Sequence, residues 1–410
     1  MECRICKNSQ LIDIVDLKEQ VITSRFPVFG DFSTPKTPIV LSLCQECSLV
    51  QLRHCTSASE LYEHESGYGY RSGINYTMRE HLHAYNTEIQ SKVDLLDGDV
   101  VLDIGSNDST MLQYYDPRLK RIGVDPTGKQ FHHYYGDVEL IPTYFTRKNV
   151  ESVYGTELRC KVISSISMFY DLPDPVQFAR DIYNLLADDG IWTCEQSYLL
   201  SMLETNSIDT ICHEHLEYYS LTAVKRIADL VGFKITDVKF NSCNGGSFRL
   251  YFGKGSSVES SLVSEILAKE EQLGVKTQGF YADFITNCDI EIEKLKAFVS
   301  ENSRTIYIYG ASTKGNCLLQ YAGLDSTHIP YAVERNLNKV GKMTSTGIEI
   351  ISEETMKCHD PAPKFLLVLP WHFRAEIIAR EYEFLENGGK LVFPFPRFEI
   401  YSLEYQLKGR

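Results

Sequence analysis

The sequence lacks any apolar stretch long enough to cross a membrane, and its first residues lack the charged and apolar regions of a signal peptide. A membrane helix needs about 20 mainly apolar residues in succession. These absences predict a cytoplasmic protein. The chain also lacks an excess of positive charge, because 41 Lys and Arg stand against 55 Asp and Glu and leave a net charge of −14. Duplex nucleic acid requires a cationic surface, so the composition argues against a nucleic-acid partner.

The composition excludes several structural classes. Hydrophobic residues make up 43% and charged residues 23% of the chain, close to the averages of folded proteins, which argues against disorder, collagen and small disulfide knots. A length of 410 residues predicts two or three domains. Five of the 12 cysteines fall within the first 55 residues, whereas the others are scattered singly. A reducing compartment disfavours disulfides, so the early cysteines need another explanation.

Two C-x-x-C pairs provide that explanation. Cys3 and Cys6 form one pair, Cys44 and Cys47 the other, and four thiolates complete a closed tetrahedral zinc site. Strand-like runs at 11–17 and 39–43 lie between the pairs. We therefore expect a structural zinc ribbon, with redox dithiols as the alternative. His54 and Cys55 either do not bind the metal or replace one of the four cysteines as a ligand.

A second pattern indicates a nucleotide-type α/β domain. An apolar strand at 99–104 leads into a turn at Gly105 and then into residues able to start a helix, and the next strand ends at Asp125, 22 residues after Asp103. An acid at that place can accept hydrogen bonds from the ribose of an adenosine. The turn has one glycine instead of G-x-G-x-x-G, which suits a cofactor without phosphates, such as S-adenosylmethionine (SAM). Alternatives are NAD and a strand without a cofactor.

The densest group of proton-transfer side chains is His213, Glu214 and His215. Histidine and glutamate are readily tuned to act as acid and base near neutral pH. H-E-H lacks the i, i+4 spacing of the H-E-x-x-H zinc motif. We expect an active-site base here; a metal site, or histidines with purely structural or solvated positions, are alternatives.

The last third predicts a second α/β unit. Residues 256–300 are helical in character, and 304–315 form a strand, a turn and the start of a helix. Gly310, Ser312, Lys314 and Gly315 could together hold an anion. Further strands are expected at 331–336, 365–372 and 390–394. The alternative is a stabilising domain whose nucleotide site is unused.

Taken in order, these motifs resemble one family, the zinc-containing, SAM-dependent C-methyltransferases that act on nucleotide-linked 4-keto-deoxysugars. The resemblance covers nearly the whole chain and rests on the paired C-x-x-C, Tyr68–Ser72, Val101–Asp108, His213–His215, Gly245–Ser247, Gly310–Asn316 and Leu369–Trp371. It implies an α/β protein with a small N-terminal zinc ribbon (1–84), a central class I methyltransferase Rossmann-like domain (85–255) and a second Rossmann-like α/β domain (256–410). The sugar nucleotide would lie between the last two.

The resemblance also implies roles for individual residues. Catalysis would fall to His215 as the base, with Glu214, His213 and Tyr70 assisting. SAM would bind at Asp103, Gly105, Asn107, Asp125 and Ser167. The nucleotide sugar would bind at Tyr170, Asn244, Ser312, Lys314 and Asn316. The reaction would remove a proton beside a ketone and methylate the resulting enolate.

The chain departs from the family at a few places. Cys212 stands where a tyrosine precedes H-E-H, Ser167–Tyr170 stand where a histidine follows the fourth strand, Ser109 replaces a glycine, and His372 replaces an asparagine. Two alternative functions therefore stay open: methylation of a hydroxyl or another carbon of a different sugar or polyol, and a non-catalytic zinc-ribbon adaptor. An anionic nucleotide would have to be held by local donors such as Lys314, against the negative charge of the whole chain.

Overall fold

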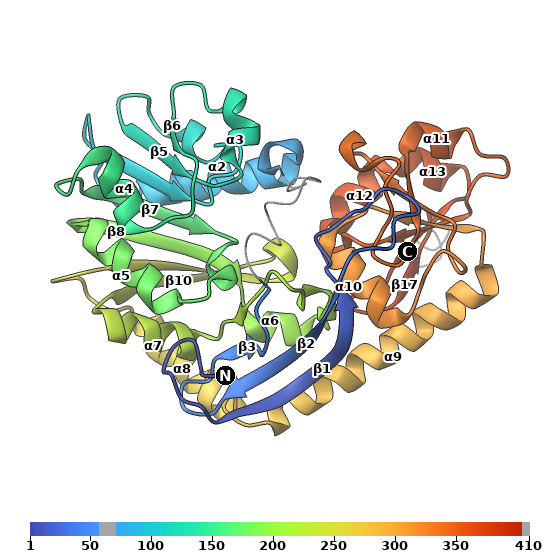
Figure 1. Ribbon diagram of the computed structural model, residues 1–410, viewed down its shortest axis with the longest axis horizontal. Helices are drawn as coiled ribbons and strands as arrows, with labels where there is room; N and C mark the ends of the chain where they lie inside the picture. The colour runs from blue at the N-terminus through green and yellow to red at the C-terminus, as the bar shows by residue number, and fades with distance from the viewer. Residues whose placement is uncertain (57–70, 404–410) are drawn as a thin grey trace.

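The chain forms two lobes that are joined by an N-terminal sheet and a long helix, as Figure 1 shows. This computed structural model describes residues 1–56 and 71–403, and Tyr70 lies outside that range. Within the described residues, no helix combines the length and the apolar character needed to cross a lipid bilayer.

The N-terminal sheet is antiparallel and takes its last strand from the middle of the chain. Its order is β1-β2-β3-β9, with β1 at Leu11–Val21, β2 at Lys36–Cys44, β3 at Val50–Leu52 and β9 at Glu217–Tyr218. Alternating side chains of β2, namely Ile39, Leu41 and Leu43, are at most 1% exposed. The two strands expected between the cysteine pairs are confirmed, whereas β9 has no signal in the sequence.

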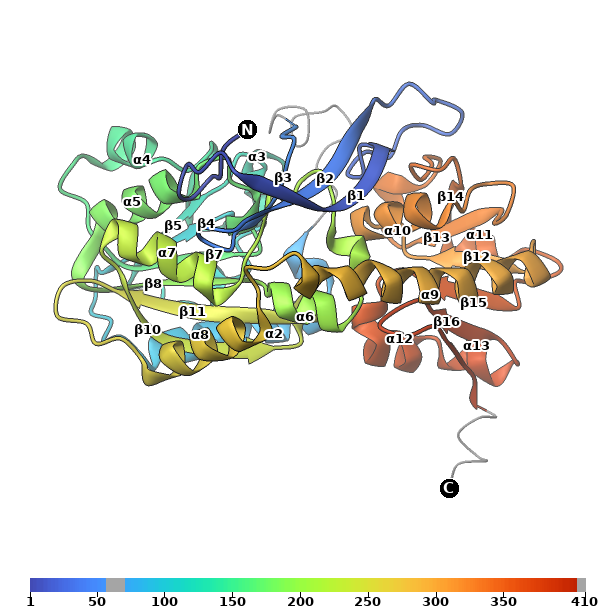
Figure 2. The same ribbon diagram turned by 90° about the horizontal axis from the view of Figure 1, so that it is seen from below.

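The first lobe is built on a seven-stranded sheet of order β10-β11-β8-β7-β4-β5-β6, in which only β11 runs antiparallel to its neighbours. Its strands are β4 (Val100–Ile104), β5 (Lys120–Val124), β6 (Glu139–Ile141), β7 (Cys160–Ile166), β8 (Leu186–Ser197), β10 (Lys234–Asn241) and β11 (Ser247–Gly253). Its helices are α2 (Tyr76–Gln90), α3 (Gly128–Phe131), α4 (Arg147–Tyr154), α5 (Pro175–Leu185), α6 (Leu199–Glu204) and α7 (Leu221–Val231). In Figure 2, α5 and α7 cover one face of this sheet and α2 lies on the other.

The helix expected after the first strand of this lobe is absent, which corrects the sequence-based prediction. Only a short 3₁₀ helix follows β4, at Leu112–Tyr114. Asn107 and Ser109 adopt left-handed backbone angles, with φ of 50° and 62°, and two such residues cannot continue a right-handed helix. The result is an irregular polar loop at the carboxyl end of β4.

The second lobe is a doubly wound sheet of order β14-β13-β12-β15-β16-β17, parallel except for β17. Its strands are β12 (Ile306–Tyr309), β13 (Tyr331–Glu334), β14 (Glu349–Ser352), β15 (Phe365–Val368), β16 (Lys390–Phe393) and β17 (Glu399–Tyr401). The helices are α10 (Thr313–Ala322), α11 (Glu353–Lys357), α12 (Arg374–Arg380) and α13 (Tyr382–Glu386). The predicted helical segment before it is α8 (Ser261–Leu273) and α9 (Gly279–Asn302), and Figure 2 shows α9 running along this lobe.

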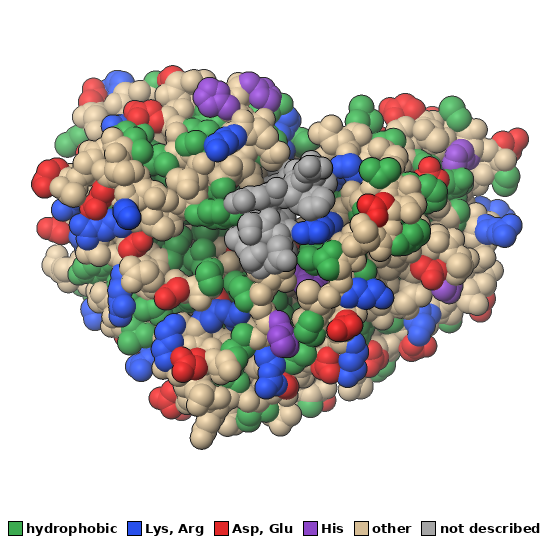
Figure 3. Space-filling model, in the orientation of Figure 1, with side chains coloured by type: hydrophobic (Ala, Val, Ile, Leu, Met, Phe, Trp, Pro, Cys, Tyr) green, Lys and Arg blue, Asp and Glu red, His purple; other side chains and the backbone are tan. Residues whose placement is uncertain are grey.

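Polar contacts tie the lobes and the N-terminal segment together. The backbone N–H of Val21 donates to Gln320 on α10 at 2.7 Å, and the indole N–H of Trp371 in the second lobe donates to Asp209 of the first lobe at 2.9 Å. The space-filling view in Figure 3 shows a notch between the two lobes. The expected joins near residues 84 and 255 stay predictions, and α2 spans the first of them.

Candidate active site and zinc site

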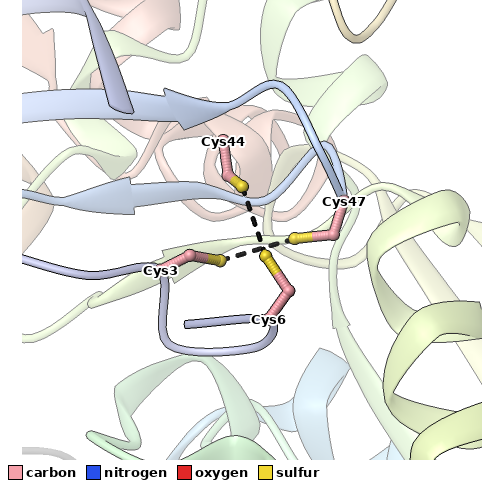
Figure 4. A group of neighbouring side chains, drawn as sticks. All are labelled: Cys3, Cys6, Cys44 and Cys47. Atoms are coloured by element: carbon pink, nitrogen blue, oxygen red, sulfur yellow. Dashed lines mark hydrogen bonds between the residues drawn. The ribbon is translucent and has the colours of Figure 1, made fainter. Parts of the chain in front are cut away.

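The four cysteines of the two C-x-x-C pairs converge on one point, as Figure 4 shows. The sulfur of Cys3 lies 3.4 Å from that of Cys47, and the sulfur of Cys6 lies 3.5 Å from that of Cys44. None of these cysteines forms a disulfide. A tetrahedron of 2.3 Å zinc–sulfur bonds places sulfur atoms about 3.8 Å apart, so the donor set fits a structural zinc ion.

Both pairs sit in the same kind of turn. The residue after each pair, Lys7 or Ser48, has a φ near 60°, and its N–H donates to the carbonyl of the first cysteine, at 3.0 Å for Cys3 and 2.8 Å for Cys44. The repeated turn directs two sulfurs of each pair towards the same point. His54 and Cys55 are exposed and lie outside the four-cysteine group.

The expected cofactor residues gather at the carboxyl ends of β4, β5 and β7. Asp125 accepts hydrogen bonds from the N–H of Asn107 at 2.8 Å and from that of Thr127 at 2.6 Å. The loop after β4 is further fixed because Asn107 accepts the N–H of Ser72 at 2.9 Å. Burial raises the pKa of Asp103 to about 7, and Ser164 donates a hydrogen bond to it at 2.5 Å.

This loop fits SAM. Gly105 has a φ of +75°, and a Cβ there would lie 3.1 Å from the side chain of Met168, so the turn needs glycine. Ser167, next to Met168, also has a left-handed backbone, with a φ of 52°. Asp125 directly follows β5, the strand beside β4, where its carboxylate can receive ribose hydroxyls. A polar loop with one glycine, next to the acid Asp125, suits an adenosine without a pyrophosphate.

His215 lies between β9 and the 3₁₀ helix at Ile208–Thr210. Its Nδ1 is 2.8 Å from the carbonyl oxygen of Thr210. A carbonyl only accepts, so Nδ1 carries the proton and Nε2 keeps its lone pair. The ring packs edge-on against Tyr170, with centroids 4.4 Å apart, and both residues line a small cavity together with Glu217. The imidazole is thus held in the tautomer of a base.

The charges around His215 come from both lobes. Burial, together with the positive charge of Lys314, lowers the pKa of His215 to about 4, although Glu214 opposes this. Burial lowers the pKa of His372 and raises that of Asp209, and Lys314 acts on both. Lys314 Nζ also donates to the backbone oxygen of Asn244 at 3.1 Å. One cation of the second lobe therefore acts on His215 of the first.

His213 and Glu214 are directed towards the N-terminal segment. The Nδ1 of His213 lies 3.4 Å from the hydroxyl of Thr23, which donates to Glu214 at 3.2 Å. Both side chains are buried, at 2% and 6% exposure. Burial lowers the pKa of His213. The structure thus separates the surroundings of His213 from those of His215, although the two are neighbours in sequence.

The expected substrate residues divide into two groups. Tyr170, Asn244 and Lys314 lie around His215 and the end of β7, and the amide of Asn244 donates to Ser167 at 3.3 Å. Ser312 caps α10, its hydroxyl accepting the N–H of Gly315 at 3.0 Å. Asn316 is 1% exposed, and its amide binds the backbone at Thr23 and Ser345, at 2.7 and 3.0 Å. In the structure Asn316 joins these two segments, and its contact with substrate stays a prediction.

A charged cluster on α2, β8 and β11 had no counterpart in the sequence analysis. Glu195 is 1% exposed and pairs with Arg249 at 2.8 Å and with His81. Burial lowers the pKa of His81, but hydrogen bonds to Cys243 and Glu195 outweigh it and raise the pKa to about 10. In the sequence, this cluster could have been suspected from Glu195, an acid at the end of a mainly apolar segment of β8. No pattern in the sequence indicated that Thr23 contacts His213 and Glu214.

Family models match the chain in three consecutive parts. Residues 3–62 match a zinc binding domain family, residues 75–238 a methyltransferase domain, and residues 242–396 a C-methyltransferase C-terminal domain. Among characterised proteins, the C-methyltransferase NovU of Streptomyces niveus is 29% identical over 419 aligned residues, which cover 99% of this chain and 98% of NovU.

Two methyltransferases are among the solved structures that match part of this chain. One is an S-adenosylmethionine-dependent methyltransferase from Clostridium acetobutylicum, 9% identical, covering 45% of this chain and 93% of that one, with a TM-score of 0.35. The other is magnesium protoporphyrin IX methyltransferase of Synechocystis PCC 6803 with bound SAH, 10% identical, covering 44% and 89%, with a TM-score of 0.35.

The family matches and the site define the class of this protein. It is an enzyme, a SAM-dependent methyltransferase, and not a non-catalytic adaptor. More narrowly, its three parts match, in order, the models of a zinc binding domain, a methyltransferase domain and a C-methyltransferase C-terminal domain, and over its length it is similar to a C-methyltransferase. The expectations for fold class, SAM and zinc are confirmed.

Proposed function

We propose that the enzyme removes a proton from the carbon next to a ketone of a nucleotide-linked sugar and methylates that carbon. The observation that carries this proposal is His215, whose Nδ1–H is held by Thr210 and whose Nε2 is left as a lone-pair acceptor. Such a fixed neutral imidazole is suited to general-base catalysis. The methyltransferase and C-methyltransferase matches support the choice of reaction class.

The proton and the electrons balance as follows. His215 Nε2 takes the proton of the α-carbon, and the electron pair of the broken C–H bond moves into the ketone as an enolate. The enolate carbon then forms its new bond to the methyl group, and the imidazolium of His215 later returns its proton to solvent. When bound, SAM supplies that methyl group on a sulfonium, which leaves as a neutral thioether.

The electrostatics around His215 have two effects on this step. Burial lowers its pKa to about 4, so the imidazole is neutral at pH 7, but the same shift makes it a weaker proton acceptor and the enolate must therefore be stabilised by its surroundings. Negative charge then develops on the ketone oxygen while the ring becomes positive. Lys314, close enough to influence the pKa of His215, supplies a further positive charge for the enolate in a site shielded from water.

The nucleotide part of the substrate is proposed from the second lobe. Lys314 lies in the first turn of α10, a helix of 10 residues that Ser312 caps, and helix N-termini attract anions. A chain with a net charge of −14 needs such local donors to hold an anionic nucleotide. Cytoplasmic location follows as an expectation from the same substrate class.

A second candidate keeps the enzyme class but changes the acceptor. Cys212 is buried against Cys317, so this position has no hydroxyl, and Tyr170 occupies the place of a titrating histidine. These departures favour a different sugar or polyol, methylated on another carbon or on oxygen.

Solvent exchange separates the two candidates. The enzyme is incubated in D₂O with a panel of nucleotide-linked 4-keto-6-deoxyhexoses and no SAM, and deuterium at the carbons beside the ketone is followed by NMR. Exchange that depends on His215 supports the enolate route. Transfer of labelled methyl from SAM to a hydroxyl, with no exchange, would establish O-methylation instead.

A further inference from the structure

The zinc turn and the loop that carries His215 are connected by one buried side chain. Arg4 lies between the ligands Cys3 and Cys6 and is 7% exposed. Its backbone N–H donates to the side chain of Gln51 on β3 at 2.9 Å, so its position is set by the metal turn and by the N-terminal sheet together.

The guanidinium of Arg4 reaches the two residues that follow His215. Its Nη1 donates to the carbonyl of Leu216 at 3.2 Å and to that of Leu52 at 2.9 Å. Its Nε lies 3.3 Å from a carboxylate oxygen of Glu217, and the side chains of this pair are 8% and 0% exposed. One rigid, planar donor therefore holds two backbone oxygens and one buried acid.

Glu217 belongs to the N-terminal sheet, and Leu216 directly precedes it. Glu217 opens β9, which pairs with β3 through Gln51, and Leu52 N–H donates to Leu216 at 2.8 Å. On the other side, the N–H of Leu216 donates to the carbonyl of Tyr170 at 2.8 Å. The peptide groups of Leu216 are thus fixed between the N-terminal sheet and Tyr170, which packs against His215.

The buried acid makes this connection specific to arginine. Glu217 is 1% exposed, and Arg4 is its ion-pair partner among the described residues. Burial raises the pKa of Glu217 well above its usual range, and the positive charge of Arg4 opposes this, so loss of Arg4 would leave a buried acid with no compensating cation among the described residues. A lysine would keep the charge but cannot reach two carbonyls and an acid in one plane.

From these contacts we infer that Arg4 is a positioning residue for His215, so that the zinc turn sets the placement of the catalytic base. Zinc then does more than hold the N-terminal sheet together. Metal loading of the Cys3–Cys6 turn and the geometry of His215 are coupled through Arg4, Leu216 and Glu217. This inference rests on the proposed role of His215 as the base.

The test compares Arg4→Met and Arg4→Lys with Lys18→Met, which removes an exposed cation from β1 of the N-terminal sheet. Zinc content is measured by metal analysis, SAM affinity by calorimetry, and the His215 ring by NMR of histidine-labelled protein, with His215→Asn assigning its signal. Turnover and its pH profile are measured with a nucleotide-linked 4-keto-6-deoxyhexose.

We expect Arg4→Met to retain one zinc per chain and SAM affinity within twofold, while it shifts the His215 signal and lowers kcat at least tenfold with KM changed less than threefold. Arg4→Lys should recover part of kcat, and Lys18→Met should match the parent. An unchanged His215 signal and kcat in zinc-loaded Arg4→Met would overturn the inference.

If Arg4→Met fails to fold, the double variant Arg4→Met/Glu217→Gln replaces it, because it leaves no unpaired buried charge. The same expected and contrary results apply to it. Failure of the proposed function gives a different pattern: the His215 signal still responds to Arg4→Met, but the parent enzyme exchanges no deuterium into any keto sugar.

Discussion

Replacement of His215 by asparagine tests the base directly. The asparagine amide can still donate to the carbonyl of Thr210, which Nδ1 contacts at 2.8 Å, but it has no counterpart of the Nε2 lone pair. The substitution should therefore preserve the loop and remove the chemistry. General-base catalysis contributes about 10²–10⁴-fold, so kcat should fall by that factor, equivalent to about 3–5 kcal/mol of activation free energy.

The pH dependence of kcat/KM provides a second quantitative test of His215. A histidine with an ordinary pKa of 6.5 would be about 24% protonated at pH 7. Burial lowers the pKa of His215 to about 4, which leaves about 0.1% protonated at pH 7. The acid limb of kcat/KM should therefore lie near pH 4 and not near pH 6.5, provided that the protein is still folded.

The fold itself is expected to weaken in the same pH window. The folded-state pKa of His215 lies below its unfolded value, so its contribution to stability is complete above pH 6.5 and is lost as pH falls towards 4. Urea unfolding across this range should show a smaller loss of stability for His215→Asn than for the parent.

The assay measures deuterium exchange beside the ketone without SAM, methyl transfer with labelled SAM, and SAM affinity by calorimetry. His328→Asn is the matched control, because that ring is 43% exposed and pairs with Asp325 on the surface of the second lobe. Exchange by His215→Asn within threefold of the parent, or an acid limb near pH 6.5, would refute the role of His215 as base.

Three further predictions concern the cofactor, the metal and the cation. Asp125→Ala should weaken SAM binding about 10- to 100-fold in calorimetry, because the ribose hydroxyls lose a charged acceptor; unchanged affinity would contradict the cofactor site. Cys44→Ser should reduce the bound zinc measured by mass spectrometry and lower the melting temperature, since a closed four-thiolate site contributes directly to folding; full stability without zinc would count against a structural ion. Lys314→Met should move the acid limb of kcat/KM to higher pH, because the lysine charge helps to lower the pKa of His215. The same variant should raise KM for the nucleotide sugar at least tenfold. An acid limb at an unchanged pH would place Lys314 away from His215.

The separation of His213 from His215 changes the interpretation of the H-E-H segment. In sequence the three residues form a single proton-transfer group. In the structure His213 and Glu214 contact Thr23 of the N-terminal segment, whereas His215 contacts Thr210 and Tyr170. Glu214 still acts on His215 electrostatically, so we propose that it tunes the base while His213 anchors the loop.

The site also shows why three segments must fold together. Asn316 of the second lobe holds the backbone of Thr23, and Trp371 of the same lobe binds Asp209 of the first. Thr23 in turn contacts His213 and Glu214, and Asp209 precedes them in the chain. Because each contact crosses between units, His215 is placed by the assembled protein and by no single domain.

The sequence by itself determined the parts whose chemistry is local. Paired cysteines at C-x-x-C spacing predict a metal turn because both sulfurs come from one short loop, and a strand that ends in a single-glycine turn predicts a phosphate-free cofactor from the residues of that loop. Hydrophobic runs likewise predicted β4 and β5 of the first lobe and β12, β13, β15 and β16 of the second. Each of these patterns lies within about a dozen residues.

Only the tertiary structure decided which distant residues meet. β9 joins the N-terminal sheet, although its Glu217 lies 166 positions after its partner Gln51 on β3. The helix expected after β4 is replaced by a loop that Asp125 and Ser72 hold in place. Arg4 looked like an unremarkable residue inside a metal turn. Its partners at Leu216 and Glu217 are over 200 positions away, and hydrogen bonds across such a span follow from packing, which no local pattern encodes.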